Sequence, residues 1–255
     1  MKTNMRRRGP AWTVAAALLA AAAGLIDGSS ARSQPLRQAL DEVTEKGLAA
    51  GLTPGLSIAV VEGDRVLWKR SSGLADLGTG RPVTEETMFY LASTSKALTA
   101  LCTAVLAERG ALSLDDPLSR FFRDVRLAEG LSADSIRMRD LLTHTHGIDP
   151  MGPVSLRVAF TGDYTNQQLL DLLPAHRAAK RGRTFQYSNL GYDLAALALS
   201  PSSKGGWKDV VAREVTEPLG MRLTTSSVSR VPEERLAQPH ELGPAGFERI
   251  PLAKE

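Results

Sequence analysis

Hydrophobic side chains alternate with a period of two in the first part of the chain. The pair Gly63-Asp64 separates two such runs. Successive side chains of a strand point to opposite faces, and a Gly-Asp pair suits a tight turn, so this pattern predicts a β-hairpin. Residues 73–82 are rich in turn formers and predict a loop. The hydrophobic positions of the predicted hairpin are Leu56, Ile58, Val60, Val66 and Trp68.

After the predicted hairpin, hydrophobic residues recur every three to four positions, as on one face of an α-helix. This spacing predicts a helix with a hydrophobic stripe that ends at Gly110, and a short helix over 37–50 precedes the hairpin. Strands followed by many helices indicate an α+β protein, with a helical region that is either inserted or packed against a sheet. The stripe consists of Leu98, Leu101, Cys102, Val105 and Leu106. Further helices are predicted to begin at Asp116-Pro117, to end at Leu141-Leu142, to carry Leu190, Leu194 and Leu197, and to carry Trp207, Val211 and Val215.

The composition is that of a folded globular protein, since 43% of the 255 residues are hydrophobic and 23% are charged. The first 33 residues contain five of the 31 basic residues and one of the 28 acidic residues. The remainder, with 26 basic and 27 acidic residues, has a net charge of −1 and gives no reason to expect a nucleic-acid partner. Cys102 is the only cysteine, and its place on the stripe favours a buried side chain over a catalytic thiol.

The N-terminus has the pattern of a secretory signal peptide. Basic residues lie within residues 2–8, an uncharged and mostly apolar run spans 11–26, and small and polar residues follow over 28–33. The apolar run is shorter than the ~20 residues of a membrane-spanning helix, although an uncleaved anchor is the alternative. We therefore predict a signal peptide over 1–33, a single domain over 34–255, a periplasmic or secreted location, and no membrane span after cleavage.

Ser93 and Lys96 form the motif S-x-x-K at the start of the striped helix. Residues three apart lie on the same helix face, so the Ser93 hydroxyl and the Lys96 amine can meet. A serine hydroxyl is a weak nucleophile until a base removes its proton, and an amine in a dry site can be that base. Tyr187 and Asn189, in the motif Y-x-N, begin a second predicted helix. A tyrosine there can shuttle a proton, and an asparagine can hold a substrate amide or orient Lys96.

These motifs and their surroundings resemble the serine β-lactamase and penicillin-binding protein superfamily. Y-x-N, where class A enzymes have S-D-N, points to the class C-like branch, which includes D-alanyl-D-alanine carboxypeptidases, esterases and amide hydrolases. The resemblance implies a β-lactamase/DD-peptidase-like fold, in which helices flank an antiparallel sheet beside a helical region. It also implies that Ser93 is the acylated nucleophile, Lys96 its base partner, Tyr187 the proton shuttle and Asn189 the substrate-binding amide. The matching segments, in the family's order, are PGLSIAVVEGD, GLADLGTGRPVTEETMFYLASTSKALTALC, ALSLDDPL, MRDLLTHTHGI, FQYSNLGYDLAALAL and EVTEPLGM.

The resemblance implies a serine hydrolase that cleaves an amide, ester or β-lactam bond of a small molecule or peptide, with no metal or organic cofactor. The family's third motif, K-T-G or H-T-G on a sheet strand, has no counterpart in the sequence. We therefore expect the C-terminal sheet strands to be missing, together with one oxyanion-hole donor, whose loss typically costs ~100–1,000-fold in rate. An unpaired strand edge would then favour self-association, and the chain alone would be a weak hydrolase.

Three alternatives stay open. His144-Thr145-His146 resembles the start of the metal-binding pattern H-x-H-x-D-H, but Ile148 and Asp149 stand where Asp and His are required. Histidines that cap helix-end carbonyls are therefore favoured over a zinc site. The second alternative is a non-catalytic homologue that binds penicillin or peptidoglycan, and the third is an inactive truncated chain.

Overall fold

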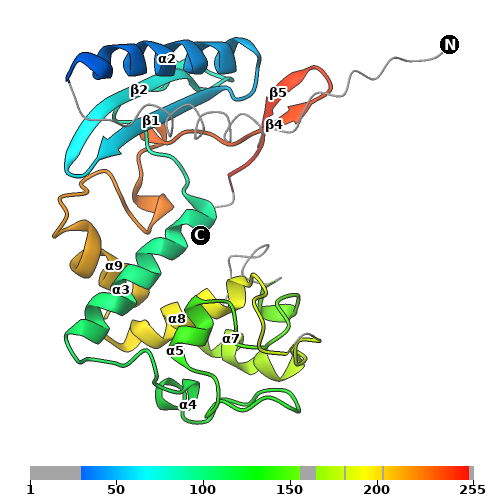
Figure 1. The fold of residues 1–255 in the computed structure, drawn as a ribbon. Coiled ribbons are helices and arrows are strands. Elements are labelled where there is room, and N and C mark those ends of the chain that lie inside the picture. Colours follow the sequence, from blue (N-terminus) through cyan, green and yellow to red (C-terminus); the bar gives the residue numbers. More distant parts are fainter. Residues whose placement is uncertain (1–29, 156–164, 181, 203, 253–255) are drawn as a thin grey trace. The chain divides into compact units, whose positions relative to one another are not determined.

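The computed structural model describes residues 30–155, 165–180, 182–202 and 204–252. They form two compact units, residues 30–89 with 233–252 and residues 90–232 (Figure 1). The predicted signal peptide falls almost wholly outside the described residues and stays a prediction. In the described ranges, no helix is long and apolar enough to cross a bilayer.

The first unit is built on the predicted hairpin. β1 (Gly55–Glu62) pairs antiparallel with β2 (Arg65–Asp76), and Gly63 forms the turn with a φ of 59°. β2 also pairs with the short β3 (Arg81–Pro82), which gives a sheet of order β1-β2-β3. Within the described part of the chain, β1 is therefore an edge strand, as a self-association surface would require, and self-association itself stays a prediction.

One helix, α2 (Ser30–Ala49), lies along the β1–β2 hairpin (Figure 1). Leu40 of α2 and Trp68 of β2 are both buried. The Trp68 indole N–H donates to the Asp41 carboxylate at 3.2 Å, and the Arg70 guanidinium donates to Asp41 at 2.7 Å and to Glu45 at 2.9 Å. Hydrophobic contact and charge-assisted hydrogen bonds therefore both hold α2 on the sheet.

Two sequence-based boundaries in this unit are wrong. α2 begins at Ser30, before the predicted helix over 37–50, and Pro35 lies inside it beyond the first turn, where it removes one backbone hydrogen bond of the helix. β2 extends into the predicted loop over 73–82. Gly73, with a φ of 80°, faces Gly55, and a Cβ at Gly73 would lie 2.4 Å from the Pro54 carbonyl oxygen. The absence of a side chain at Gly73 therefore lets β1 and β2 approach closely at a position where the sequence pattern indicated a loop.

A second hairpin, which the sequence pattern did not predict, completes the first unit. β4 (His240–Gly243) and β5 (Gly246–Arg249) pair antiparallel as a separate two-stranded sheet. The segment before β4 is joined to the first sheet, because the Gln238 N–H donates to the Ala75 carbonyl at 2.8 Å. These strands are short and none of their residues is buried, so they lack the hydrophobic alternation that reveals a strand in a sequence.

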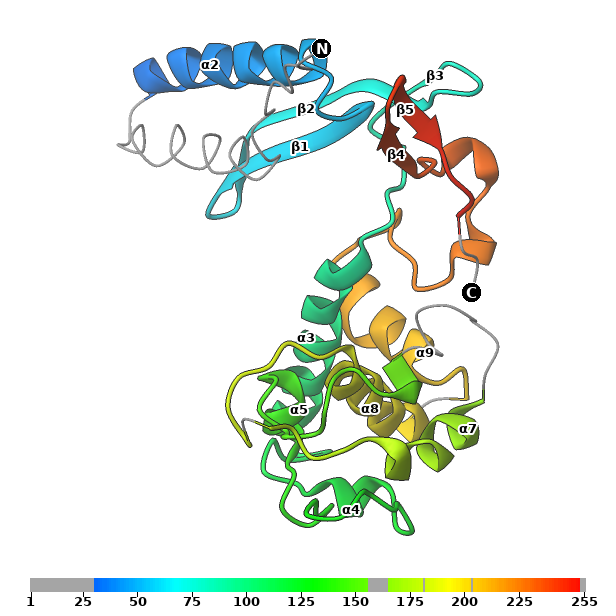
Figure 2. The same cartoon turned by 90° about the vertical axis from the view of Figure 1, so that its right-hand side faces the viewer.

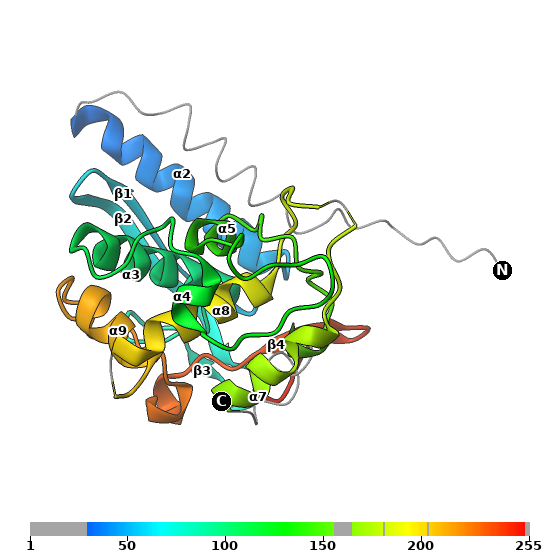
Figure 3. The ribbon, with the colours of Figure 1, turned by 90° about the horizontal axis from the view of Figure 1, so that it is seen from below.

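The second unit is helical (Figures 2 and 3). Its two longest helices, α3 (Lys96–Glu108) and α8 (Asn189–Leu199), contact each other and were both predicted. The other helices that the structure describes in this unit are α4 (Leu118–Phe121), α5 (Met138–Leu142), α7 (Asn166–Asp171) and α9 (Trp207–Val211), which continues as a π-helical turn over Ala212–Thr216. The 3₁₀ turns of this unit are Ala92–Ser95, Leu173–Ala175, Ser200–Ser202 and Val228–Arg230, and Glu233–Arg235 belongs to the first unit.

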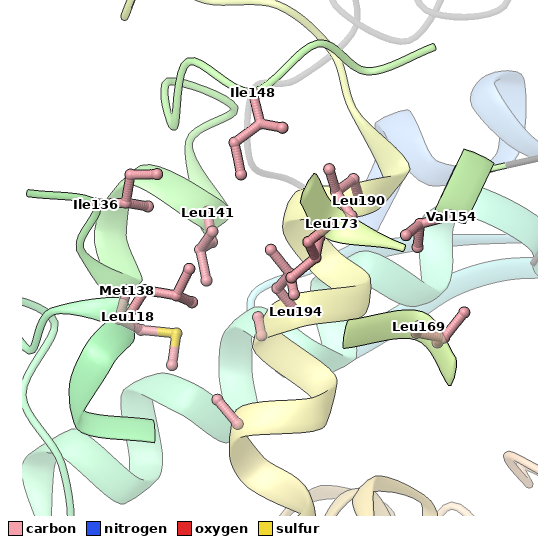
Figure 4. Packing of buried hydrophobic residues seen from close by; sticks show 12 residues of the cluster. Leu118, Ile136, Met138, Leu141, Ile148, Val154, Leu169, Leu173, Leu190 and Leu194 are labelled. Carbon is pink, nitrogen blue, oxygen red and sulfur yellow. The ribbon is translucent and has the colours of Figure 1, made fainter. Parts of the chain in front are cut away.

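Two hydrophobic clusters form the core of the helical unit. In the first, α5 and α8 pack together, and Leu141, Leu190 and Leu194 lie between them (Figure 4). In the second, Cys102 and Leu106 of α3 pack against residues of α9 and its π-helical extension. The other members of the second cluster are Leu112, Leu199, Val210, Val211 and Val215.

The predicted stripe of α3 is only partly the buried face. Cys102 and Leu106 are buried as predicted, but Leu101 is 42% exposed. Thr99 and Thr103 are buried instead. Their hydroxyls are satisfied, since Thr103 donates to the Thr99 carbonyl at 2.8 Å and Thr99 accepts from the Trp207 indole at 3.1 Å. A threonine with such partners is buried at little cost, which a count of hydrophobic residues misses.

The start of α4 also differs from the prediction by one position. Pro117 is the N-cap, and the helix begins at Leu118, so neither Asp116 nor Pro117 has the predicted place. The buried Asp116 carboxylate instead accepts from the Ser113 backbone N–H and from the Arg120 guanidinium, both at 2.6 Å. It thus stabilises the turn before α4.

Candidate active site

Ser93 lies in the 3₁₀ turn Ala92–Ser95 that leads directly into α3. Ala92, the residue before it, has a φ of 46°, in the left-handed region that costs a non-glycine residue free energy. Two hydroxyls hold this turn, because Thr94 donates to the Leu91 carbonyl and Ser95 donates to the Ala92 carbonyl at 2.6 Å. The residues between Ser93 and Lys96 therefore fix the backbone that presents the Ser93 side chain.

Two side chains predicted as catalytic, Lys96 and Tyr187, contact the hydroxyl oxygen of the third, Ser93. The Lys96 Nζ donates to the Ser93 Oγ at 3.2 Å. The Tyr187 hydroxyl, which is 94 residues away in the sequence, donates to the same Oγ at 2.7 Å. Lys96 Nζ also lies 5.1 Å from the centre of the Tyr187 ring. The two motifs S-x-x-K and Y-x-N thus meet as predicted, at the starts of α3 and α8.

Electrostatics favour proton transfer at Tyr187. Hydrogen bonds with Lys96 and then with Ser93 hold the pKa of the Tyr187 phenol below its ordinary value, against a smaller opposing effect of burial. A phenol with a lowered pKa more readily becomes the phenolate that accepts a proton from a neighbouring hydroxyl. The side chain is 50% exposed, so a substrate can reach it.

The fourth predicted site residue, Asn189, is the first residue of α8 and is exposed. In the described part of the structure its amide makes no hydrogen bond to Ser93, Lys96 or Tyr187. Its position two residues after Tyr187 places it beside the site, and its predicted role in holding a substrate amide stays a prediction.

The predicted carbonyl-capping role of His144 and His146 is wrong. The His144 Nδ1 accepts the Ser188 backbone N–H at 3.1 Å, and the His146 Nδ1 accepts the Ile148 backbone N–H at 3.1 Å. Both rings therefore accept hydrogen bonds where donation was expected. The donors are the backbone N–H of Ser188, directly before α8, for His144 and that of Ile148, two residues further on, for His146.

Sequence reasoning missed three neighbours of the site. The His144 ring packs against Tyr187, with ring centres 4.8 Å apart, and against Tyr192, at 5.3 Å. Lys96 Nζ lies 5.7 Å from the centre of the Tyr192 ring. Burial raises the pKa of the Asp193 carboxyl to about 7, an effect that the Lys96 charge opposes. The available signal for Asp193 was an acidic residue between the hydrophobic positions of α8, whereas His144 was noted only within His144-Thr145-His146 and not as a neighbour of Tyr187.

The fold and the Ser93–Lys96–Tyr187 arrangement together define a class, the active-site serine proteins of the β-lactamase and penicillin-binding protein type. Comparison with known families agrees, because the family model described as Beta-lactamase matches residues 40–254. The chain belongs to this family, which confirms the resemblance inferred from the sequence and the α+β fold class.

Two relatives that match most of this chain are named as an esterase and as a hydrolase. The chain is 33% identical to Esterase EstB of Burkholderia gladioli over 217 residues, which cover 80% of this chain and 54% of EstB. It is 30% identical to Unguisins hydrolase ungD' of Aspergillus campestris (strain IBT 28561), over 89% of this chain and 44% of that protein. The chain thus spans about half the length of these relatives.

Solved structures share the fold. The structure of EstCE1, described as a hydrolase with promiscuous acyltransferase activity, is 27% identical with a TM-score of 0.74, over 87% of this chain and 61% of EstCE1. A class C β-lactamase in complex with cefoxitin is 24% identical with a TM-score of 0.69, over 87% of this chain and 59% of that chain. At that identity the second likeness concerns the fold alone.

Proposed function

We propose that the protein is an exported serine hydrolase that cleaves ester or amide bonds through an acyl-enzyme on Ser93. The observation that carries this proposal is the convergence of two proton-transferring groups on one hydroxyl, since Ser93 Oγ accepts from Lys96 at 3.2 Å and from Tyr187 at 2.7 Å. A serine held between a tyrosine and a lysine is an activated nucleophile. The esterase and hydrolase names of the relatives support the same reaction class.

The reaction has two steps. In acylation, Ser93 Oγ bonds to the substrate carbonyl carbon and passes its proton to the Tyr187–Lys96 pair. The pair then gives that proton to the leaving alcohol or amine as its bond to the carbonyl carbon breaks. In deacylation, water passes a proton to the same pair, its oxygen bonds to the acyl carbon, and Ser93 regains the proton as the acid leaves. Asn189, beside this pair, is the proposed contact for the substrate amide.

Covalent labelling tests the nucleophile. We expect a fluorophosphonate to add to the wild-type protein once, as seen by intact mass, and Ser93→Ala to abolish the adduct without a change in the circular dichroism spectrum. Ser229→Ala is the matched control, because Ser229 is an exposed serine of the same unit and its loss should leave labelling unchanged. Labelling of Ser93→Ala at another residue would refute the assignment.

Turnover distinguishes the hydrolase from the non-catalytic homologue. A hydrolase releases p-nitrophenol from p-nitrophenyl acetate continuously, whereas a binding protein accumulates a stable adduct on Ser93 and stops. Export is tested separately, by the mass of the protein recovered from the periplasm of a bacterial host. Loss of about the first 33 residues is the expected result of signal cleavage, and an intact N-terminus in the membrane fraction would favour the anchor.

A further inference from the structure

His144 combines an unusual backbone conformation with a place directly beside the proposed proton shuttle. It follows α5 with a φ of 60°, in the left-handed region that is uncommon for residues other than glycine, although Asn, Asp and His are enriched there. The turn is held locally, since the Thr145 N–H donates to the Asp140 carbonyl at 2.9 Å and the hydroxyls of Thr143 and Thr145 are 2.9 Å apart. Strained residues of this kind persist only where the surrounding structure fixes them, and they cluster at functional sites.

His144 accepts two hydrogen bonds, one from the residue before Tyr187 and one from the residue after it. The backbone N–H of Gln186 donates to the His144 carbonyl oxygen at 2.9 Å, and the backbone N–H of Ser188 donates to the His144 Nδ1 at 3.1 Å. Gln186 and Ser188, on either side of Tyr187, are therefore both hydrogen-bonded to His144. The His144 ring also lies against the Tyr187 ring, with centres 4.8 Å apart. Backbone and ring contacts together restrict where the Tyr187 hydroxyl can lie.

The bond to Ser188 requires a neutral imidazole. Because Nδ1 accepts a hydrogen bond, the ring proton must reside on Nε2. Burial, and then the charge of Lys96, hold the pKa of the His144 imidazole below its ordinary value. The neighbours of the ring include the rings of Phe185, Tyr187 and Tyr192. The charged or titratable groups that act on it include Lys96 of α3 and His146. The surroundings of His144 therefore favour the acceptor form that the Ser188 bond needs.

We propose that His144 is a positioning residue, which holds the segment from Gln186 to Ser188 so that the Tyr187 hydroxyl reaches Ser93 Oγ. The role goes beyond the proposed function, and it rests on that function only in so far as the Tyr187–Ser93 contact serves catalysis. His144 itself does not touch the reacting atoms. The proposal requires that its effect on the reaction passes through Tyr187, which makes the effect separable by experiment.

The first measurement needs no substrate. Titration of the phenols by ultraviolet difference absorbance, with Tyr187→Phe to assign the Tyr187 component, follows the contact of Tyr187 with Lys96 and Ser93. His144→Gly keeps the left-handed backbone but removes the acceptor and the ring, so we expect the lowered pKa of Tyr187 to return toward that of a free tyrosine. His144→Asn keeps an acceptor and tolerates a positive φ, so we expect it to retain the lowered pKa. An unchanged Tyr187 titration in His144→Gly would overturn the proposal.

The second measurement uses the rate of fluorophosphonate labelling of Ser93. We expect His144→Gly to slow labelling about tenfold or more, part of the ~100–10,000-fold that a positioned acid–base group contributes. In a Tyr187→Phe background the same change should cost less than about twofold, because its effect acts through the hydroxyl that is already absent. Equal losses in both backgrounds would overturn the proposal.

Controls separate folding and function from positioning. His240→Gly is the matched control, since His240 Nε2 also accepts a backbone N–H, from Leu77 at 3.2 Å, but belongs to the other unit. It should change neither readout. If His144→Gly fails to fold, His144→Asn decides alone, because a folded Asn variant that loses the Tyr187 titration would contradict the proposal. A wild-type protein that does not react with the fluorophosphonate would refute the hydrolase function, while the phenol titration would still decide the role of His144.

Discussion

His146 makes the stability of the protein depend on pH in the acid range. Its side chain is 2% exposed, its Nδ1 accepts from Ile148, and its Nε2 has no hydrogen-bond partner among the described residues. Burial, and then the neighbouring His144, lower the pKa of the His146 imidazole from 6.5 to about 4, while Asp140 acts in the opposite direction. A proton on this ring is therefore disfavoured in the folded protein but not in the unfolded chain.

The sign and size of the effect follow from the two pKa values. Between pH 6.5 and about 4 the unfolded chain binds a proton at His146 and the folded protein does not, so the free energy of unfolding falls as the pH falls. Below pH 4 both states carry the proton and the loss is complete. At about 1.4 kcal/mol per pH unit, the total loss is about 3 kcal/mol.

Urea unfolding of the wild type and of His146→Asn, followed by circular dichroism over this pH range, measures the effect. Asn at this position can still accept the Ile148 N–H, because a short side-chain oxygen bonds the backbone two residues on, but it does not titrate. We expect the wild type to lose about 3 kcal/mol more than the variant as the pH falls from 6.5 to 4. Parallel stability curves for the two proteins would refute this reasoning, as would a His146 proton resonance that titrates near pH 6.5.

Two further predictions concern packing in the helical unit and its single thiol. Gly191→Ala should lower the free energy of unfolding by about 1–3 kcal/mol in a urea titration, because its Cβ would lie 2.6 Å from the Leu141 carbonyl oxygen and would force α5 and α8 apart. Gly47→Ala on α2 is the control that should not destabilise, because its Cβ would make only an ordinary contact with the Leu52 side chain, at 3.9 Å. Cys102 is fully buried and burial raises the pKa of its thiol to about 11, so a thiol reagent should modify it only after unfolding, and rapid modification of the native protein would contradict this.

The sequence was sufficient for those parts of the fold that local pattern determines. The β1–β2 hairpin shows alternation on both strands and a Gly-Asp turn, and α3 and α8 show helical spacing with clear ends. Ser93 and Lys96 could be paired because three residues along a helix bring side chains to one face. Tyr187 could be joined to them only through the family resemblance, since no local rule links positions that are 94 residues apart.

The errors arose where tertiary contacts override local pattern. Thr99 and Thr103 are buried on α3 because their hydroxyls have partners, one of them the distant Trp207. The loop predicted at Gly73 is a strand because Gly55 lies opposite and the two backbones approach closely. In both cases the deciding contact comes from a segment far along the chain, which hydrophobic periodicity cannot report.

The backbone strain of the described chain is concentrated around the proposed nucleophile. In the described ranges, the non-glycine residues with positive φ are Ala92 and His144. Ala92 directly precedes Ser93, and His144 holds the residues on either side of Tyr187. Neither conformation is favourable for its residue, and each costs of order 1–3 kcal/mol, so both must be offset by packing and hydrogen bonds elsewhere. Contacts of α8 with α3 and with α5 support both turns, because the Ala92 turn leads into α3 and the His144 turn follows α5. Ser93 and Tyr187 are thus each placed by a neighbouring residue whose own backbone conformation is unfavourable. The placement of these two side chains is maintained at a cost in local backbone stability.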